Sequence, residues 1–258
     1  MRRNGIRRTA PLLAAMAALL AGPACAQSPP APGRFDGWTT AVIAADWRDG
    51  RGQPMQAFDN ARRDIVRGFQ AAGLPRATMT DYSLRPDAPD PVTSAEALQG
   101  VAETAARGQS GCLLYFTSHG SPDGIVFGPK ETISPAAMAN LVRRWCGSRP
   151  TVVIVSACYS GVFINALAAS NRMILTAASR ERTSFGCGAE ETYPWFDGCV
   201  LEALPTARDF LALAAGARAC VARREQEAGI TLSSDPQLYV GADMQMRLPT
   251  LRFERSGS

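Results

Sequence analysis

The sequence of 258 residues contains a single histidine, His119, and a single lysine, Lys130. It has seven cysteines but no C-x-x-C pair. With one histidine, a zinc site would need cysteines from widely separated segments, so we expect neither a metal nor another cofactor. The missing C-x-x-C motif also argues against a thiol redox protein.

The N-terminal segment has an apolar run that extends only from Pro11 to about Leu20. Arginines at positions 2, 3, 7 and 8 precede it, and Ala24-Cys25-Ala26 follows as a small-residue cleavage site. This order predicts a secretory signal peptide over residues 1–26. The alternative is a membrane anchor, but a span needs roughly 20 apolar residues. We therefore expect a periplasmic or secreted protein, without a membrane span after cleavage.

A basic surface is also missing. The formal net charge of +4 falls by four to zero when residues 1–26 are removed, because they hold four arginines and no acid. The other arginines are scattered among acidic residues, without a basic stripe or interleaved aromatics. We expect no nucleic-acid partner.

The rest of the chain is predicted to form one domain of the α/β class. Residues 27–36 are a proline-rich leader that cannot build a helix or a central strand. Over residues 37–258, apolar runs alternate with amphipathic segments. The predicted strands are residues 39–46, 77–84, 111–118, 151–157, 172–178 and 237–241. The predicted helices run from Phe58 to Gly73, from Thr93 onwards, and over residues 135–147, about 162–170 and about 206–224.

Two helix starts carry specific capping signals. Thr93 and Glu96 have the spacing of a capping box, and Ser134-Pro135 supplies an N-cap followed by a proline in the first helical position. Strands that are apolar throughout, separated by such helices, indicate a mostly parallel sheet covered on both faces.

Two reactive residues follow consecutive predicted strands. His119 comes after GCLLYFTS and Cys158 after TVVIVSA, each in a turn-forming context. Parallel sheets place their chemistry at the carboxyl ends of strands, and consecutive strands tend to be neighbours. A thiol beside an imidazole is a nucleophile with its base. The N–H groups of Gly120 and Cys158 are candidate donors to a developing oxyanion. Taken singly, such a cysteine or histidine is more often structural.

These residues resemble a known family. The stretches YFTSHGSPDGIVFG and VVIVSACYSG, with 39 residues from His119 to Cys158, are similar to legumain-type cysteine peptidases (asparaginyl endopeptidases), relatives of caspases and metacaspases. The segments LTAASRERTSFGCGAEETYPWF and SSDPQLYVG extend the resemblance over roughly residues 38–242. The combination is most similar to bacterial exported members of the family.

The resemblance implies a single caspase-like peptidase domain, a three-layer sandwich with a mostly parallel six-stranded central sheet. It implies that His119 is the general base and acid, Cys158 the nucleophile and the Gly120 N–H an oxyanion donor. The implied partner is a peptide or protein substrate. A transpeptidase would use the same dyad with a different acceptor, and a non-catalytic peptide-binding module is the alternative from another class.

The resemblance also implies a substrate pocket formed by Ser156, Thr183, Ser184 and Asp197. Legumains have a glutamate at the position of Ser156 and often one at that of Tyr159, and they carry an Arg-His pair that is missing here. A preference for asparagine therefore does not carry over. A polar loop is the alternative for positions 183 and 184. Arg48 and Arg51 are alternative pocket cations by location, with solvated loop charges as the other interpretation.

Six cysteines remain after signal cleavage. Cys112 opens one predicted strand and Cys146 precedes the next, so we hypothesise a disulfide between them, opposite the catalytic edge. Cys187 has Cys199 or Cys220 as alternative partners, and this pairing stays open. If Cys158 is free, at least one other cysteine has no partner within the chain.

Overall fold

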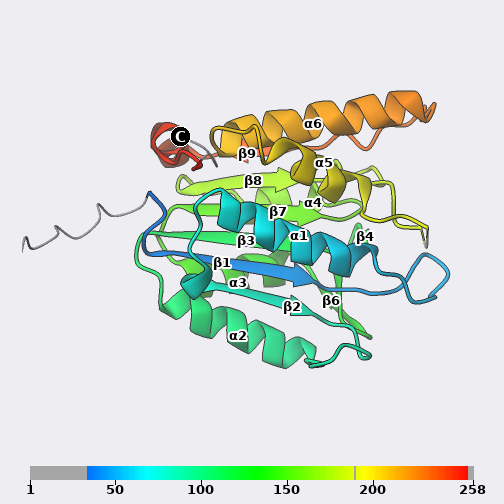
Figure 1. Ribbon diagram of the computed structural model, residues 1–258, viewed down its shortest axis with the longest axis horizontal. Helices are drawn as coiled ribbons and strands as arrows, with labels where there is room; N and C mark the ends of the chain where they lie inside the picture. Colours follow the sequence, from blue (N-terminus) through cyan, green and yellow to red (C-terminus); the bar gives the residue numbers. More distant parts are fainter. Residues whose placement is uncertain (1–33, 189, 255–258) are drawn as a thin grey trace, which may run out of the picture. The chain divides into compact units, whose positions relative to one another are not determined.

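A six-stranded sheet forms the centre of the computed structural model, which describes residues 34–188 and 190–254 (Figure 1). In sheet order its strands are β2 (Met79–Ser83), β1 (Trp38–Ala44), β3 (Gly111–Thr117), β7 (Thr151–Ser156), β8 (Arg172–Thr176) and β9 (Leu238–Val240). Only β9, at one edge, is antiparallel to its neighbour β8. The predicted mostly parallel sheet is confirmed.

Helices cover both faces of the sheet, as the continuous apolar strands require. On one face lie α1 (Ala57–Ala71), α5 (Trp195–Ala203) and α6 (Phe210–Glu227), which share a core cluster with Val42, Leu113, Tyr115 and Ile154. On the other face lie α2 (Ser94–Ala106), α3 (Pro135–Cys146) and α4 (Val162–Leu167), packed on the alternate strand residues. The α/β three-layer sandwich that the resemblance implies is therefore confirmed.

Both capping signals act as the sequence predicts. The Thr93 side chain accepts from the Glu96 amide, and the Glu96 carboxylate accepts from the Thr93 amide at 2.8 Å. The Ser134 hydroxyl accepts from the Ala137 amide, with Pro135 in the first turn of α3. These caps fix where α2 and α3 begin.

Several short elements are additions to the prediction. A three-stranded antiparallel sheet, β4 (Gly120–Ser121), β5 (Gly124–Phe127) and β6 (Glu131–Ile133), follows His119 directly. Helix α6 begins at Phe210 rather than about 206, after the Asp209 cap. The other additions are α5, α7 (Ala242–Arg247), and the 3-10 turns η1 (Arg76–Thr78) and η2 (Leu248–Thr250). Apart from α5 and α6, these elements are too short to show a clear periodicity.

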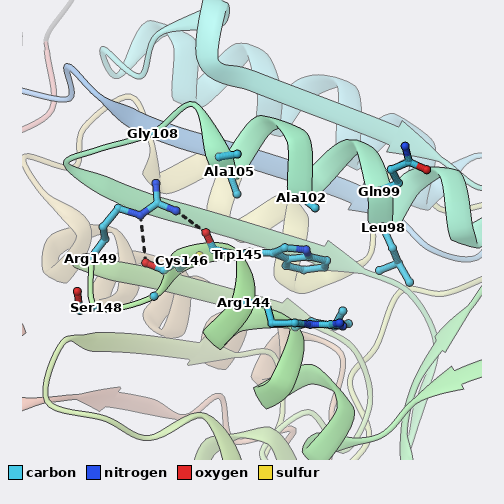
Figure 2. A pocket seen from close by; sticks show the side chains of 13 residues that line it. Leu98, Gln99, Ala102, Ala105, Gly108, Arg144, Trp145, Cys146, Ser148 and Arg149 are labelled. Atoms are coloured by element: carbon cyan, nitrogen blue, oxygen red, sulfur yellow. Dashed lines mark hydrogen bonds between the residues drawn. The ribbon is translucent and has the colours of Figure 1, made fainter.

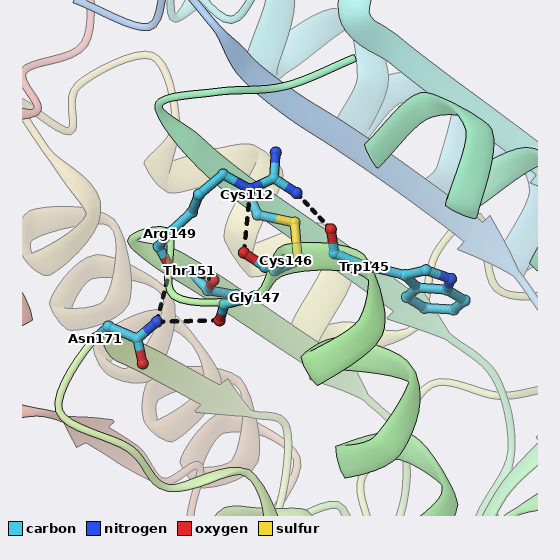
Figure 3. The surroundings of a disulfide bond; sticks show 7 residues. All are labelled: Cys112, Trp145, Cys146, Gly147, Arg149, Thr151 and Asn171. Atoms are coloured by element: carbon cyan, nitrogen blue, oxygen red, sulfur yellow. Dashed lines mark hydrogen bonds between the residues drawn. A yellow bond between two sulfur atoms is a disulfide. The ribbon is translucent and has the colours of Figure 1, made fainter. Parts of the chain in front are cut away.

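Two disulfides tie elements together. Cys112 and Cys146 are bonded, with 5.8 Å between their Cα atoms, at the amino end of β3 (Figure 3). The Nε of Arg149 donates to the Cys146 carbonyl oxygen there at 3.0 Å. The hypothesised Cys112–Cys146 bond is confirmed. The second bond joins Cys199 to Cys220.

The predicted signal peptide, residues 1–26, and most of the leader at 27–36 lie outside the described residues. Among the residues that are described, no helix combines the length and the apolar character needed to cross a membrane.

Candidate active site

The His119 ring lies just past the carboxyl end of β3, in a polar and aromatic setting. Its Nε2 is 2.8 Å from the carbonyl oxygen of Arg48. Its ring meets that of Phe58 edge to face, with 5.1 Å between centroids. The strand end is fixed because the Ser118 amide donates to the Ser156 carbonyl at 3.0 Å.

The contact with Arg48 assigns the ring nitrogens. A carbonyl oxygen only accepts hydrogen bonds, so Nε2 carries the proton and donates it. In the neutral ring, Nδ1 is then the unprotonated nitrogen, which can take a proton from another group. A neutral His119 ring bonded in this way has its lone pair at Nδ1.

Cys158 follows β7 and packs against the loop that follows β8. The Ser184 amide donates to the Cys158 Sγ at 3.3 Å, and the Ser184 hydroxyl is 3.6 Å from the same sulfur. Tyr159 has a φ of 56°, a left-handed conformation that is uncommon without glycine, and its amide donates to the Arg182 carbonyl at 2.7 Å. A sharp turn therefore presents the thiol at the strand end.

The two reactive segments touch each other through Gly120. A Cβ added to Gly120 would lie 2.2 Å from the carbonyl oxygen of Cys158, which is closer than real side chains approach. Strands β3 and β7 are hydrogen-bonded neighbours, with Thr117 opposite Ser156. The structure therefore brings the His119 and Cys158 segments together at one edge of the sheet.

The residues of the predicted substrate pocket occupy different environments. Ser184 contacts the Cys158 sulfur, and Thr183 is exposed in the same loop. Ser156 and Asp197 are buried, with exposed fractions of 3% and 0%. The Asp197 carboxylate lies in the core beneath the strand ends, where Thr117 Oγ1 donates to it at 2.6 Å.

The two arginines considered as pocket cations also differ. The Arg48 guanidinium pairs with Asp46 at 2.8 Å and donates to the Gly128 and Pro129 carbonyl oxygens. These contacts anchor the loop whose carbonyl holds His119. Arg51 is exposed, and its amide donates to the Asp49 carboxylate.

The segment that carries these residues matches a known family. Residues 96–202 match the Peptidase C13 family. The matched span includes both His119 and Cys158. The predicted resemblance to legumain-type peptidases is confirmed, and so is the class of enzyme, a cysteine peptidase acting on peptides or proteins.

A solved structure shares the fold. Caspase-1 from Spodoptera frugiperda superposes with a TM-score of 0.58 at 14% identity, over 79% of this chain and 86% of that chain. At this identity the likeness shows the fold alone. No curated protein matches the chain.

Cys187 is a second free thiol close to the site of the peptidase. It packs against Met55 and Phe58, and Phe58 in turn contacts His119. Burial raises the pKa of the Cys187 thiol far above its ordinary value, and the negative charge of a Cys158 thiolate raises it further. Both partners considered for Cys187 are therefore wrong, because Cys187 is free and Cys199 is bonded to Cys220.

Sequence reasoning missed three contributors to the site. The Arg48 carbonyl is a backbone group, so the residue type at position 48 does not indicate its contact with His119. Phe58 was assigned only to the helix core, although its ring also supports His119. Tyr115 is buried in β3 and donates to Asp197 at 2.5 Å. The only indication in the sequence is that Tyr115 carries the one hydroxyl group of the apolar run GCLLYF.

A separate hollow of about 670 Å³ lies between α2 and α3, near the amino ends of the strands (Figure 2). Trp145 and Arg144 of α3 and Leu98 and Gln99 of α2 line it. It contains none of the predicted site residues, and it lies beside the Cys112–Cys146 bond. Among the described residues, no three cysteine, histidine or acidic side chains are placed to hold a metal ion.

Proposed function

We propose that the protein is an endopeptidase that cleaves peptide bonds with Cys158 as nucleophile and His119 as general base. The observation that carries the proposal is the meeting of two strand ends. The Gly120 backbone packs on that of Cys158, and the Arg48 carbonyl keeps the His119 Nδ1 available for a proton. The match to the Peptidase C13 family supports the same assignment.

The reaction follows from these roles. The Cys158 sulfur transfers its proton to the imidazole and attacks the carbonyl carbon of the peptide bond. The negative charge that develops on the carbonyl oxygen is met by the N–H groups of Gly120 and Cys158, each worth roughly 3 kcal/mol of barrier. The imidazolium returns its proton to the leaving amine as the C–N bond breaks, which leaves an acyl-enzyme.

Water completes the cycle. His119 takes a proton from the water molecule that attacks the thioester, and Cys158 leaves as the thiolate. An amine in place of water would give transpeptidation by the same residues. A cleavage assay with and without an added amine acceptor distinguishes the two products by mass.

The decisive experiment compares three purified proteins on a peptide library: the wild type, Cys158→Ala and Cys187→Ala. We expect Cys158→Ala to lose cleavage and Cys187→Ala to retain it, because Cys158 is the proposed nucleophile and its backbone packs on Gly120, next to His119. The library also reports the residue preferred before the scissile bond. Equal cleavage by wild type and Cys158→Ala would contradict the proposal.

We further propose that the peptidase acts in the periplasm or outside the cell. The two disulfides support this, because such bonds persist in oxidising compartments. N-terminal sequencing of the protein recovered from cell fractions should give Gln27 as the first residue. Recovery of the intact N-terminus in the cytoplasm would contradict it.

A further inference from the structure

Asp197 is enclosed by hydroxyl groups. Tyr115 donates to one carboxylate oxygen at 2.5 Å, and Thr117 donates to the other at 2.6 Å. The Ser156 hydroxyl also acts on the carboxylate and lowers its pKa. Both oxygens are engaged, and the exposed fraction of Asp197 is 0%. The side chain therefore presents no surface to a substrate.

The donors come from the two strands that carry the reactive residues. Thr117 ends β3, two residues before His119, and Ser156 ends β7, two residues before Cys158. The register places Thr117 and Ser156 directly opposite each other. One carboxylate on α5 thus connects both strand ends at the point where the chain turns towards the site.

We infer that Asp197 is a positioning residue, which holds the His119 and Cys158 segments in place by connecting the ends of β3 and β7. The inference rests on the proposed function for its effect on cleavage. It differs from the pocket-wall role that the family resemblance implies, because a pocket wall contacts the substrate and this carboxylate contacts the strand ends.

The energetics support a role beyond stability. Burial raises the pKa of Asp197 to about 6, although the hydroxyl groups of Thr117, Tyr115 and Ser156 oppose the shift. A carboxylate in the core costs free energy, and well-packed apolar residues would often serve stability equally well. Perturbed acids of this kind cluster at functional sites.

The test compares Asp197→Asn with Asp209→Asn. Asp209 is also buried, but it caps α6, a role that asparagine fulfils, and its side chain contacts Ala212 and Arg208. We expect Asp197→Asn to lower kcat about tenfold or more, with KM and the preferred residue before the scissile bond unchanged. Asp209→Asn should match the wild type. An altered KM or residue preference at unchanged kcat would overturn the inference, as would wild-type kinetics.

Two further measurements keep the test independent of folding and of the substrate. If Asp197→Asn does not fold, Thr117→Val removes one of the hydrogen bonds, and wild-type kcat in that variant would overturn the inference. The rate of Cys158 alkylation at neutral pH needs no substrate, and we expect it to fall in Asp197→Asn. An unchanged rate overturns the inference, whereas a wild type that alkylates rapidly at Cys158 but cleaves no peptide contradicts the proposed function instead.

Discussion

At the scale of single residues, a backbone carbonyl orients His119 in the proposed dyad, as a carboxylate orients the histidine of a Ser-His-Asp triad. The Arg48 carbonyl fixes the tautomer and the orientation of the ring. Unlike a carboxylate, this carbonyl carries no titratable charge. The Arg48 side chain secures the carbonyl in turn through Asp46 and the loop at Gly128.

The free thiols should differ in reactivity. Burial and the neighbouring negative charges raise the pKa of Cys187, which keeps that thiol protonated at neutral pH, and the thiolate is the reactive form. We expect iodoacetamide at pH 7 to modify Cys158 at least tenfold faster than Cys187. Peptide mass mapping over a time course measures both rates, and His119→Ala is the control that should slow only the Cys158 reaction. Faster labelling of Cys187 would contradict this.

Asp197 should leave a signature in the pH dependence of stability. Its pKa is raised from 3.8 to about 6 in the folded state, so the folded protein binds a proton more tightly than the unfolded chain. That contribution is complete below pH 3.8 and is lost as pH rises through 6. Relative to Asp197→Asn, the wild type should lose on the order of 3 kcal/mol of unfolding free energy across this range. Urea unfolding of both proteins between pH 4 and 7 measures it, and parallel curves would contradict the assignment.

At the scale of elements, the capping box of α2 stabilises the start of this one helix. Thr93→Ala removes the side-chain acceptor for the Glu96 amide and should lower the free energy of unfolding by about 1 kcal/mol. Thr93→Ser keeps the acceptor and should stay within a few tenths of the wild type. Urea denaturation compares the three proteins. The capping role is wrong if the alanine and serine variants are equally stable.

The accuracy of the sequence predictions also depends on the element. The five parallel strands and the long helices were predictable because their residue patterns extend over five or more residues. The β4–β6 sheet was not, since its strands of two to four residues are set by pairing with each other. Helix α5 was missed because it is buried on most sides, so its sequence WFDGCVLEA lacks a polar face.

The candidate site was predictable to a similar degree and for similar reasons. His119 and Cys158 could be found because parallel strands deliver their following residues to one edge. The buried position of Asp197 could not, since its three partners come from β3 and β7 and only the folded register assembles them. The sequence shows which residue types can react with each other. It does not show which side chains the fold brings into hydrogen-bonding contact.

At the scale of the whole molecule, the two disulfides lie in different layers. Cys112–Cys146 connects the sheet to α3, and Cys199–Cys220 joins α5 to α6 on the opposite face. The bonded cysteines are 34 residues apart in the sequence for the first bond and 21 residues apart for the second. Each therefore constrains the unfolded chain over a moderate loop, independently of the other.

Replacing either pair by alanines should lower the free energy of unfolding by about 3 to 4 kcal/mol, slightly more for the longer loop. Neither replacement should change the residue preference of the peptidase, because none of the four cysteines is a predicted pocket residue. Denaturant unfolding without reductant measures the stability, and library cleavage measures the preference. A loss below about 1 kcal/mol would contradict the structural role of that bond.

The close approach at Gly120 has a parallel at Gly161, where an added Cβ would lie 2.4 Å from the Arg180 amide nitrogen. Both glycines are required by backbone contacts, whatever chemistry takes place beside them. The packing constraint on the glycines does not depend on the chemical constraint on the proposed reactive residues. In a descendant of this protein that no longer cleaved peptides, other residues could replace His119 and Cys158. The same descendant would still need glycine at positions 120 and 161, because the backbone contacts at this sheet edge leave no room for a side chain.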